Sequence, residues 1–247
     1  MRGMDNRTIP RFFYVPFIKV LTDMTTLSDV NTRRGESQPP DIGFASNVIP
    51  ETNSSRTGVS VRYALDENKK WFVLRATYGR ANKVYNIIQK DGQEAYIPLG
   101  YQLKEINGKK KRLKAPLLPN LVFVYAAEDY VKSLTDNPVY RTFVNFYYNH
   151  FSIDKYGKNP PLTIDYASMI NFINLTSIDN KHIRIVDPRH CKYKSGELVR
   201  IIDGEFKGVI GRVARAAGEQ RVVVELEGVC WVATAYIPTA FLQAYME

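Results

Sequence analysis

The stretch WFVLRATYGRANKVYNII, residues 71–88, decides how the first folded segment begins. Its first seven residues are largely apolar and run into Tyr78-Gly79, which predicts a strand closed by a turn. Apolar side chains then recur with the i, i+3, i+4, i+7 spacing that places them on one face of an amphipathic helix. These helix residues are Ala81, Val84, Tyr85 and Ile88. Gly92 marks the expected helix end.

Further along, Asn107-Gly108 separates the extended runs 95–106 and 109–125. Both turn residues tolerate the positive φ that a type I′ turn requires, so a hairpin is predicted. The other expected elements are a helix over 128–134, a strand over 143–148 and a helix capped by Asp165. Residues 69–176 therefore predict an α+β fold, an α/β sandwich with an antiparallel sheet.

The C-terminal part has five short runs rich in β-branched residues, with glycine in several turns. Strands this short and closely spaced predict a small five-stranded β-barrel over 195–247. Residues 177–194 are basic, lack a period and predict a linker. The expected barrel strands are 197–203, 209–216, 221–227, 229–237 and 241–246.

Composition excludes several classes of protein. Of the 247 residues, 45% are hydrophobic, which is enough for a core and argues against disorder of the whole chain. No run approaches the roughly 20 apolar residues of a membrane helix, so we expect no membrane partner. Two cysteines cannot form a disulfide framework or a structural zinc site. We expect no metal and no cofactor, since the sequence has neither the spacing of metal ligands nor a dinucleotide fingerprint.

Charge is distributed unevenly. The net charge is +9, but residues 1–68 carry eight basic and eight acidic residues, so the whole excess lies in 69–247. That excess favours a polyanionic partner or an acidic protein surface.

The leader, residues 1–68, is rich in Thr, Ser, Asn, Asp and Pro after residue 22, and we expect it to be disordered or loosely held. Its apolar run 12–21 resembles a signal peptide, but Pro16 and Lys19 interrupt the run and no small-residue cleavage site follows. The alternatives are an apolar N-terminal extension that tends to associate, and a translation start assigned upstream of the true one. We therefore expect a cytoplasmic protein.

At the level of motifs, the first segment resembles the N-terminal (NGN) domain of NusG-family transcription elongation factors. The resemblance rests on WFVLRATYGR (71–80), EINGKKKRLKAP (105–116) and LLPNLVFVY (117–125). SGELVRIIDGEFKGVIGRV (195–213) resembles the KOW domain, an SH3-like barrel that follows the NGN domain in this family. With its long leader and its divergent details, the chain resembles a specialised paralogue of this family. Such a paralogue is either a UpxY-type antiterminator of capsular polysaccharide operons or an RfaH-like factor.

This resemblance implies a transcription antitermination factor that acts on a specific operon. An apolar pocket would bind the clamp helices of RNA polymerase, hold the clamp closed and promote read-through. The resemblance implies that the RNA-polymerase-binding residues are those at the matching positions of this sequence, namely Leu117, Leu118, Pro119, Leu121 and Phe123. The alternative is that these are ordinary core or strand residues.

The pocket differs from the family pattern. Leu118 and Leu121 stand where the family usually has aromatic residues, and Asn120 stands where Gly is frequent. Asn tolerates the same left-handed backbone as Gly. The pocket hypothesis predicts that Leu121→Asp abolishes retention on polymerase and leaves the fold intact.

Basic residues supply candidate nucleic-acid contacts. Around the hairpin, these residues would contact nucleic acid or an acidic polymerase surface. The alternative is that they form a solvated hairpin tip, whose lysines prevent the exposed strand edge from pairing with another chain. Near the first helix, the resemblance implies contact with non-template DNA, and the alternative is an ordinary exposed helix face. The hairpin residues are Lys104, Lys109, Lys110, Lys111, Arg112 and Lys114, and the helix residues are Tyr78, Arg80, Lys83 and Lys90.

In the KOW segment, Phe206 and Lys207 are candidate contacts for a ribosomal protein, a termination factor or nascent RNA. The alternative function for the chain is an RNA-binding or ribosome-associated KOW protein. We expect a monomer.

Catalysis is not expected. Asp187, His190 and Cys191 contain the residue types of a triad, but adjacency in a basic segment is no evidence of triad geometry. The sequence also lacks a phosphate-binding Gly-Lys-Ser/Thr loop and a dinucleotide fingerprint.

Overall fold

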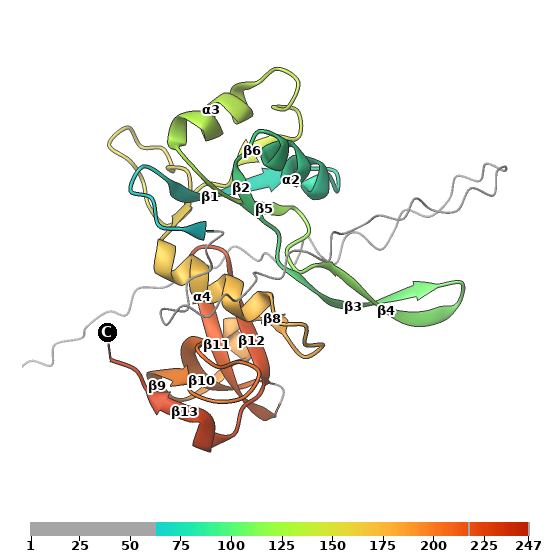
Figure 1. Cartoon of the computed structure of the whole chain (residues 1–247), viewed down its shortest axis with the longest axis vertical. Coiled ribbons are helices and arrows are strands. Elements are labelled where there is room, and N and C mark those ends of the chain that lie inside the picture. The colour runs from blue at the N-terminus through green and yellow to red at the C-terminus, as the bar shows by residue number, and fades with distance from the viewer. Residues whose placement is uncertain (1–62, 217, 247) are drawn as a thin grey trace, which may run out of the picture. The chain divides into compact units, whose positions relative to one another are not determined.

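The computed structural model describes residues 63–216 and 218–246 (Figure 1). The leader hypothesis for residues 1–62 lies outside the described residues. The first part contains a central antiparallel sheet, a separate two-stranded ribbon and three α-helices. Its elements are β1 (Lys70–Ala76), α2 (Ala81–Lys90), β2 (Glu94–Tyr96), β3 (Leu99–Ile106), β4 (Lys109–Pro116), β5 (Leu121–Ala126), α3 (Glu128–Asp136), β6 (Val144–Phe146), β7 (Thr163–Ile164) and α4 (Tyr166–Thr176).

The central sheet has the strand order β2-β5-β1-β6, and β7 also pairs with β1. β1 and β5 are antiparallel, with Trp71 opposite Tyr125 and Val73 opposite Phe123. Every residue of β5 is buried, and accordingly the strand has no charged position in its sequence. The predicted α+β architecture with an antiparallel sheet is confirmed.

Each face of the sheet is covered by helices. On one face, α2 and α3 bury Val84, Ile88 and Val131 against the side chains of β1 and β5. On the other face, α4 packs Phe172 against Phe123, with their ring centroids 5.6 Å apart. α4 begins where expected, because the side chain of Asp165 accepts a hydrogen bond from the Ser168 backbone N–H at 2.9 Å.

One predicted run is divided by a proline. The extended run 95–106 forms two strands: β2 pairs with β5, whereas β3 pairs with β4. Pro98 lies between them, and its carbonyl accepts a hydrogen bond from the Leu117 N–H at 2.8 Å. The ribbon therefore leaves the central sheet at this point. The predicted hairpin turn is confirmed, with φ of 52° at Asn107 and 70° at Gly108.

The end of the leader is part of the folded unit. Tyr63 is 2% exposed, and its ring packs edge-to-face on Trp71 at a centroid distance of 5.2 Å. The Tyr125 hydroxyl accepts a hydrogen bond from the Asp66 N–H at 2.8 Å. Residues 63–68 thus pack at one end of the sheet, ahead of the expected domain boundary at residue 69.

The C-terminal part is a six-stranded antiparallel sheet of order β13-β9-β10-β11-β12-β8. The segment 177–194, expected to be an irregular linker, contributes β8 and the start of β9, because Trp231 of β12 pairs with Val186. The strands and 3₁₀ turns are β8 (Arg184–Val186), η3 (Pro188–His190), β9 (Lys192–Ile201), β10 (Ile210–Ala216), β11 (Glu219–Leu226), β12 (Cys230–Tyr236), η4 (Thr239–Phe241) and β13 (Leu242–Ala244). Closure of this sheet into a KOW barrel remains a prediction.

Candidate functional site

The proposed docking segment, residues 117–121, connects the ribbon to β5. Its path is fixed by backbone hydrogen bonds, in which Leu121 N–H donates to the Leu118 carbonyl at 3.1 Å and Ala76 N–H donates to the Asn120 carbonyl at 2.8 Å. The left-handed backbone that the resemblance suggested for Asn120 is not adopted. Among the described non-glycine residues, positive φ occurs at Tyr78 and Asn107.

Burial divides the five proposed pocket residues into two groups. Leu118, Leu121 and Phe123 are 1%, 2% and 0% exposed, so they support the sheet from within rather than present a surface. Leu117 and Pro119 remain partly exposed. Contact of this segment with polymerase stays a prediction, and Leu117 and Pro119 are its accessible members.

Leu117 is positioned by a glycine of the ribbon. A Cβ added at Gly100 would lie 2.7 Å from the Leu117 Cγ, closer than van der Waals contact allows. Because Gly100 has no side chain, Leu117 can pack closely against β3, and the Leu117 side chain remains partly exposed to solvent. This requirement is visible only once the two segments are placed together.

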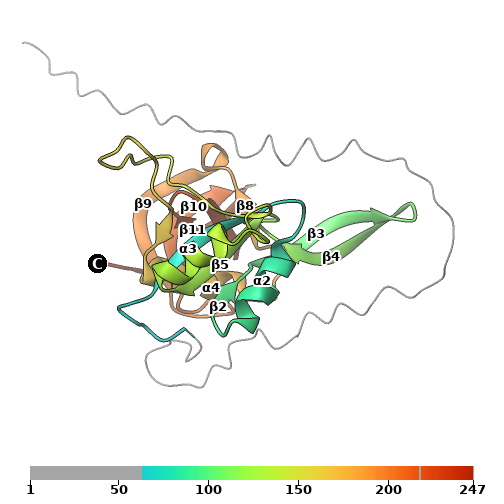
Figure 2. The ribbon, with the colours of Figure 1, turned by 90° about the horizontal axis from the view of Figure 1, so that it is seen from above.

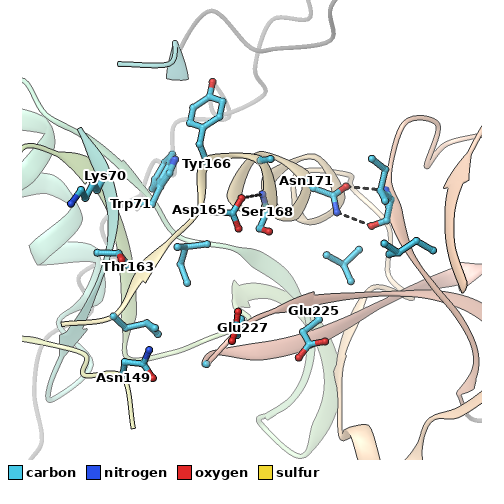
Figure 3. A pocket seen from close by; sticks show the side chains of 18 of the residues that line it. Lys70, Trp71, Asn149, Thr163, Asp165, Tyr166, Ser168, Asn171, Glu225 and Glu227 are labelled. Atoms are coloured by element: carbon cyan, nitrogen blue, oxygen red, sulfur yellow. Dashed lines mark hydrogen bonds between the residues drawn. The ribbon is translucent and has the colours of Figure 1, made fainter. Parts of the chain in front are cut away.

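α4 also forms one wall of a cavity of about 1070 Å³, shown in Figure 3. The carboxylates of Glu225 and Glu227 lie across the cavity from Asp165. Burial raises the pKa of the Glu225 carboxyl. Asn171 of α4 bonds to the backbone of Ile210 in both directions, donating to its carbonyl at 2.7 Å and accepting from its N–H at 2.9 Å. α4 is thus bonded to β10 as well as packed on β5.

A cation–aromatic cluster lies at the start of α2. Tyr78 is 81% exposed and has a φ of 57°, which bulky side chains rarely adopt. The Arg80 guanidinium carbon lies 5.4 Å from the Tyr78 ring centroid and 5.0 Å from that of Phe143. Lys83 Nζ lies 5.1 Å from the Phe143 ring centroid. The structure thus brings together three of the four proposed DNA-contact residues at this end of α2.

Lys90, the fourth of these residues, is exposed in the last turn of α2. It lies seven positions after Lys83, which places it on the same side of the helix about two turns away. Phe143 was missed by sequence reasoning, because a buried aromatic before a strand gives no sign that cations lie over its ring.

The ribbon carries the second set of basic residues. Lys109, Lys110, Lys111 and Arg112 are all exposed on β4. Their side chains alternate between the two faces of the ribbon, because successive residues of a strand point to opposite sides. These four basic residues, which are adjacent in the sequence, therefore form two pairs, one on each face of the ribbon.

The two KOW candidates differ in exposure. Phe206 is 4% exposed and anchors its loop from within, so it is not accessible for a partner in this structure. Lys207 is exposed between Gly204 and Gly208, whose φ values are 81° and 93°. These glycines let the loop reverse direction tightly.

Asp187 and Cys191 of the hypothetical triad lie in surroundings that do not favour catalysis. The carboxylate of Asp187 accepts hydrogen bonds from the side chain and backbone of Arg189, which lowers the pKa of Asp187 to about 2. Burial raises the pKa of the Cys191 thiol, which disfavours a nucleophilic thiolate. In the part of the chain that the structure describes, no three His, Cys, Asp or Glu side chains are grouped as a metal site would require.

Residues 69–153 match the family described as "Transcription termination factor nusG". This match supports membership in the NusG family. It covers β1 to β6, including the ribbon, the docking segment and the Tyr78 cluster. No curated protein matches the chain. Within the described ranges, every helix is too short or too polar to cross a membrane.

Proposed function

We propose that this protein is a non-catalytic transcription elongation and antitermination factor that binds the clamp helices of RNA polymerase. The observation that carries the proposal is the NusG match over residues 69–153. Within that range, Leu117 and Pro119 offer partly exposed apolar surface at the junction of ribbon and sheet. Apolar contact with a helix pair, surrounded by charged groups that fix orientation, is an established mode of recognition.

The proposal includes promotion of read-through in a specific operon, such as one for capsular polysaccharide synthesis. The C-terminal sheet would act as a KOW domain that binds a ribosomal protein, a termination factor or nascent RNA, with Lys207 as a contact. In this arrangement the first part holds the polymerase while the second recruits a partner.

The test separates this function from that of a ribosome-associated RNA-binding protein. The purified full chain is mixed with core RNA polymerase or with ribosomal subunits, and complexes are separated by gel filtration. We expect retention on polymerase, and run-off transcription on the native operon leader should show read-through that depends on the protein. Retention on ribosomal subunits alone would contradict the proposal and support the alternative function.

The nucleic-acid contact near α2 yields a separate prediction. One face of Tyr78 lies against Arg80, and its exposed ring would stack on an unpaired base of the non-template strand. Tyr78→Ala should weaken binding to labelled single-stranded DNA by about 1–3 kcal/mol, the usual value of one base–aromatic stack. Tyr78→Phe retains the ring and serves as the matched control. Equal affinities for the two variants, measured by fluorescence anisotropy, would rule out stacking.

A further inference from the structure

The β3–β4 ribbon stands apart from the other sheets. In the described residues these strands pair only with one another, and Figures 1 and 2 show the ribbon extending away from the β1–β5 sheet. Isolated two-stranded ribbons are marginally stable in water. Side chains that weaken such a ribbon therefore need an explanation other than folding.

The strand register assigns each side chain to a face. Residues directly opposite one another in an antiparallel pair share a face. The first face, called here the Glu105 face, contains Tyr101 opposite Lys114, Leu103 opposite Arg112 and Glu105 opposite Lys110. The second, called the Lys104 face, contains Gln102 opposite Leu113, Lys104 opposite Lys111 and Ile106 opposite Lys109.

The charges of the Glu105 face are partly compensated. Glu105 lies opposite Lys110. Lys114 Nζ lies 3.1 Å from a carboxylate oxygen of Asp179, and the Tyr101 hydroxyl donates to the same carboxylate at 2.9 Å. Asp179 thereby holds the base of this face against the segment that follows α4.

The Lys104 face has three lysines and no carboxylate. Lys104 and Lys111 are directly opposite, an arrangement that destabilises a strand pair through like-charge repulsion. Sequence reasoning grouped all the basic residues of the hairpin together, whereas the register separates a compensated face from an uncompensated one. A polyanion bound to the Lys104 face would relieve the repulsion that the fold itself leaves in place.

We propose that the Lys104 face binds the phosphate backbone of duplex DNA without sequence specificity. The face has no aromatic side chain on which an unpaired base could stack, which disfavours a single strand. A two-stranded ribbon fits the major groove of B-form DNA, whereas the major groove of an RNA duplex is too narrow.

The side chains of the Lys104 face also match phosphates better than bases or proteins. Lysines act as point charges on phosphates, and Gln102, the one amide on this face, donates to the Pro116 carbonyl at 2.9 Å. An acidic protein partner would more typically meet Tyr, Trp or Arg, and Tyr101 and Arg112 both lie on the opposite face.

This inference deepens the nucleic-acid contact in the proposed function, but its test requires no polymerase. Failure to bind duplex DNA would not by itself count against polymerase docking, and loss of polymerase retention would not by itself count against duplex binding. The two proposals can therefore fail independently.

The experiment measures the salt dependence of binding to a mixed-sequence duplex of about 30 base pairs, long enough to span the ribbon. The variant Lys104→Gln/Lys111→Gln removes the opposed pair, and Lys110→Gln/Arg112→Gln removes the same charge from the other face as the matched control. Each neutralised phosphate contact changes the slope of log K against log salt by about 0.9, so the first variant should lower the slope by about 1.8. The wild type should then lose about 12-fold more affinity than this variant between 50 and 200 mM salt.

The control variant should keep a slope close to that of the wild type. Equal slope changes in the two variants would overturn the assignment to one face. An unchanged slope in the Lys104→Gln/Lys111→Gln variant would overturn duplex binding, and if that variant also lost retention on core polymerase, an acidic protein surface would be the occupant. A second readout is thermal stability, because Lys104→Glu places a carboxylate opposite Lys111. It should raise the melting temperature while weakening duplex binding, and a lowered melting temperature would overturn the like-charge argument.

Discussion

Leu121→Asp is expected to unfold the protein rather than to remove a surface contact. Leu121 is 2% exposed at the start of β5. Arg75 lies opposite it on β1 but is itself exposed, so its charge is hydrated and does little to compensate a buried carboxylate. A carboxylate buried there loses its hydration, and the usual cost is several kcal/mol. The free energy of unfolding of an ordinary domain is only about 5–15 kcal/mol, so this substitution would remove most of it.

The pH dependence of this variant has a definite sign. Burial raises the pKa of the introduced carboxyl above its unfolded value of about 3.9. The folded state therefore binds the proton more tightly, and stability is recovered as the pH falls toward 4 and lost as the pH rises through the folded pKa. Thermal unfolding followed by circular dichroism at pH 4.5 and pH 7.5 would measure the difference.

Leu121→Met is the matched control, since a volume-conserving apolar exchange usually costs less than about 1.5 kcal/mol. If Leu121→Asp melted cooperatively at the wild-type temperature at pH 7.5, the burial of this side chain would be contradicted. The expectation from sequence that this variant keeps its fold is corrected by the burial. Loss of polymerase retention in Leu121→Asp would not be evidence for docking.

Local patterns in the sequence predicted the elements whose signals are themselves local. The apolar spacing after Tyr78 predicted α2, Asn107-Gly108 predicted the hairpin turn, and Asp165 predicted the start of α4. Each depends on residues within a few positions of one another. Such signals survive folding because the surrounding structure agrees with them.

Features set by distant segments could not be predicted in this way. β5 has no charged residue and is buried on both faces, so its sequence cannot show that α4 covers Phe123. β8 is three residues long and exists because β12 pairs with it. The positions of Tyr63 and Phe206 in the core likewise depend on partners far along the chain.

For the candidate site, composition indicated a basic hairpin, and only the register distinguishes its two faces. The opposition of Lys104 to Lys111 requires knowing that Asn107 and Gly108 form the turn without a bulge. Tyr78 lies in the turn before α2 with a positive φ, a backbone conformation that a tyrosine rarely adopts, and the sequence shows the turn but not this conformation. Tertiary structure thus determined which of the predicted residues can reach a partner.

Leu117→Asp is the second prediction with a large effect, and it tests docking without disturbing the core. Leu117 is partly exposed, lies against Gly100 and directly precedes the buried residues of the docking segment. A carboxylate there remains hydrated in the free protein but would be desolvated against an apolar helix surface. Central apolar contacts of this kind often contribute about 2 kcal/mol or more to binding, so we expect retention on core polymerase to fall about 30-fold.

Leu65→Asp is the matched control, because Leu65 is 69% exposed and lies outside the docking segment, so the variant adds the same charge. Both variants should melt close to the wild-type temperature, which separates a lost contact from a lost fold. If Leu117→Asp bound polymerase as the wild type does, the docking segment would have to be abandoned, even though the NusG match over residues 69–153 would remain. A loss confined to Leu117→Asp would instead place the polymerase contact at the junction of ribbon and sheet, next to the ribbon whose Lys104 face is proposed to bind duplex DNA.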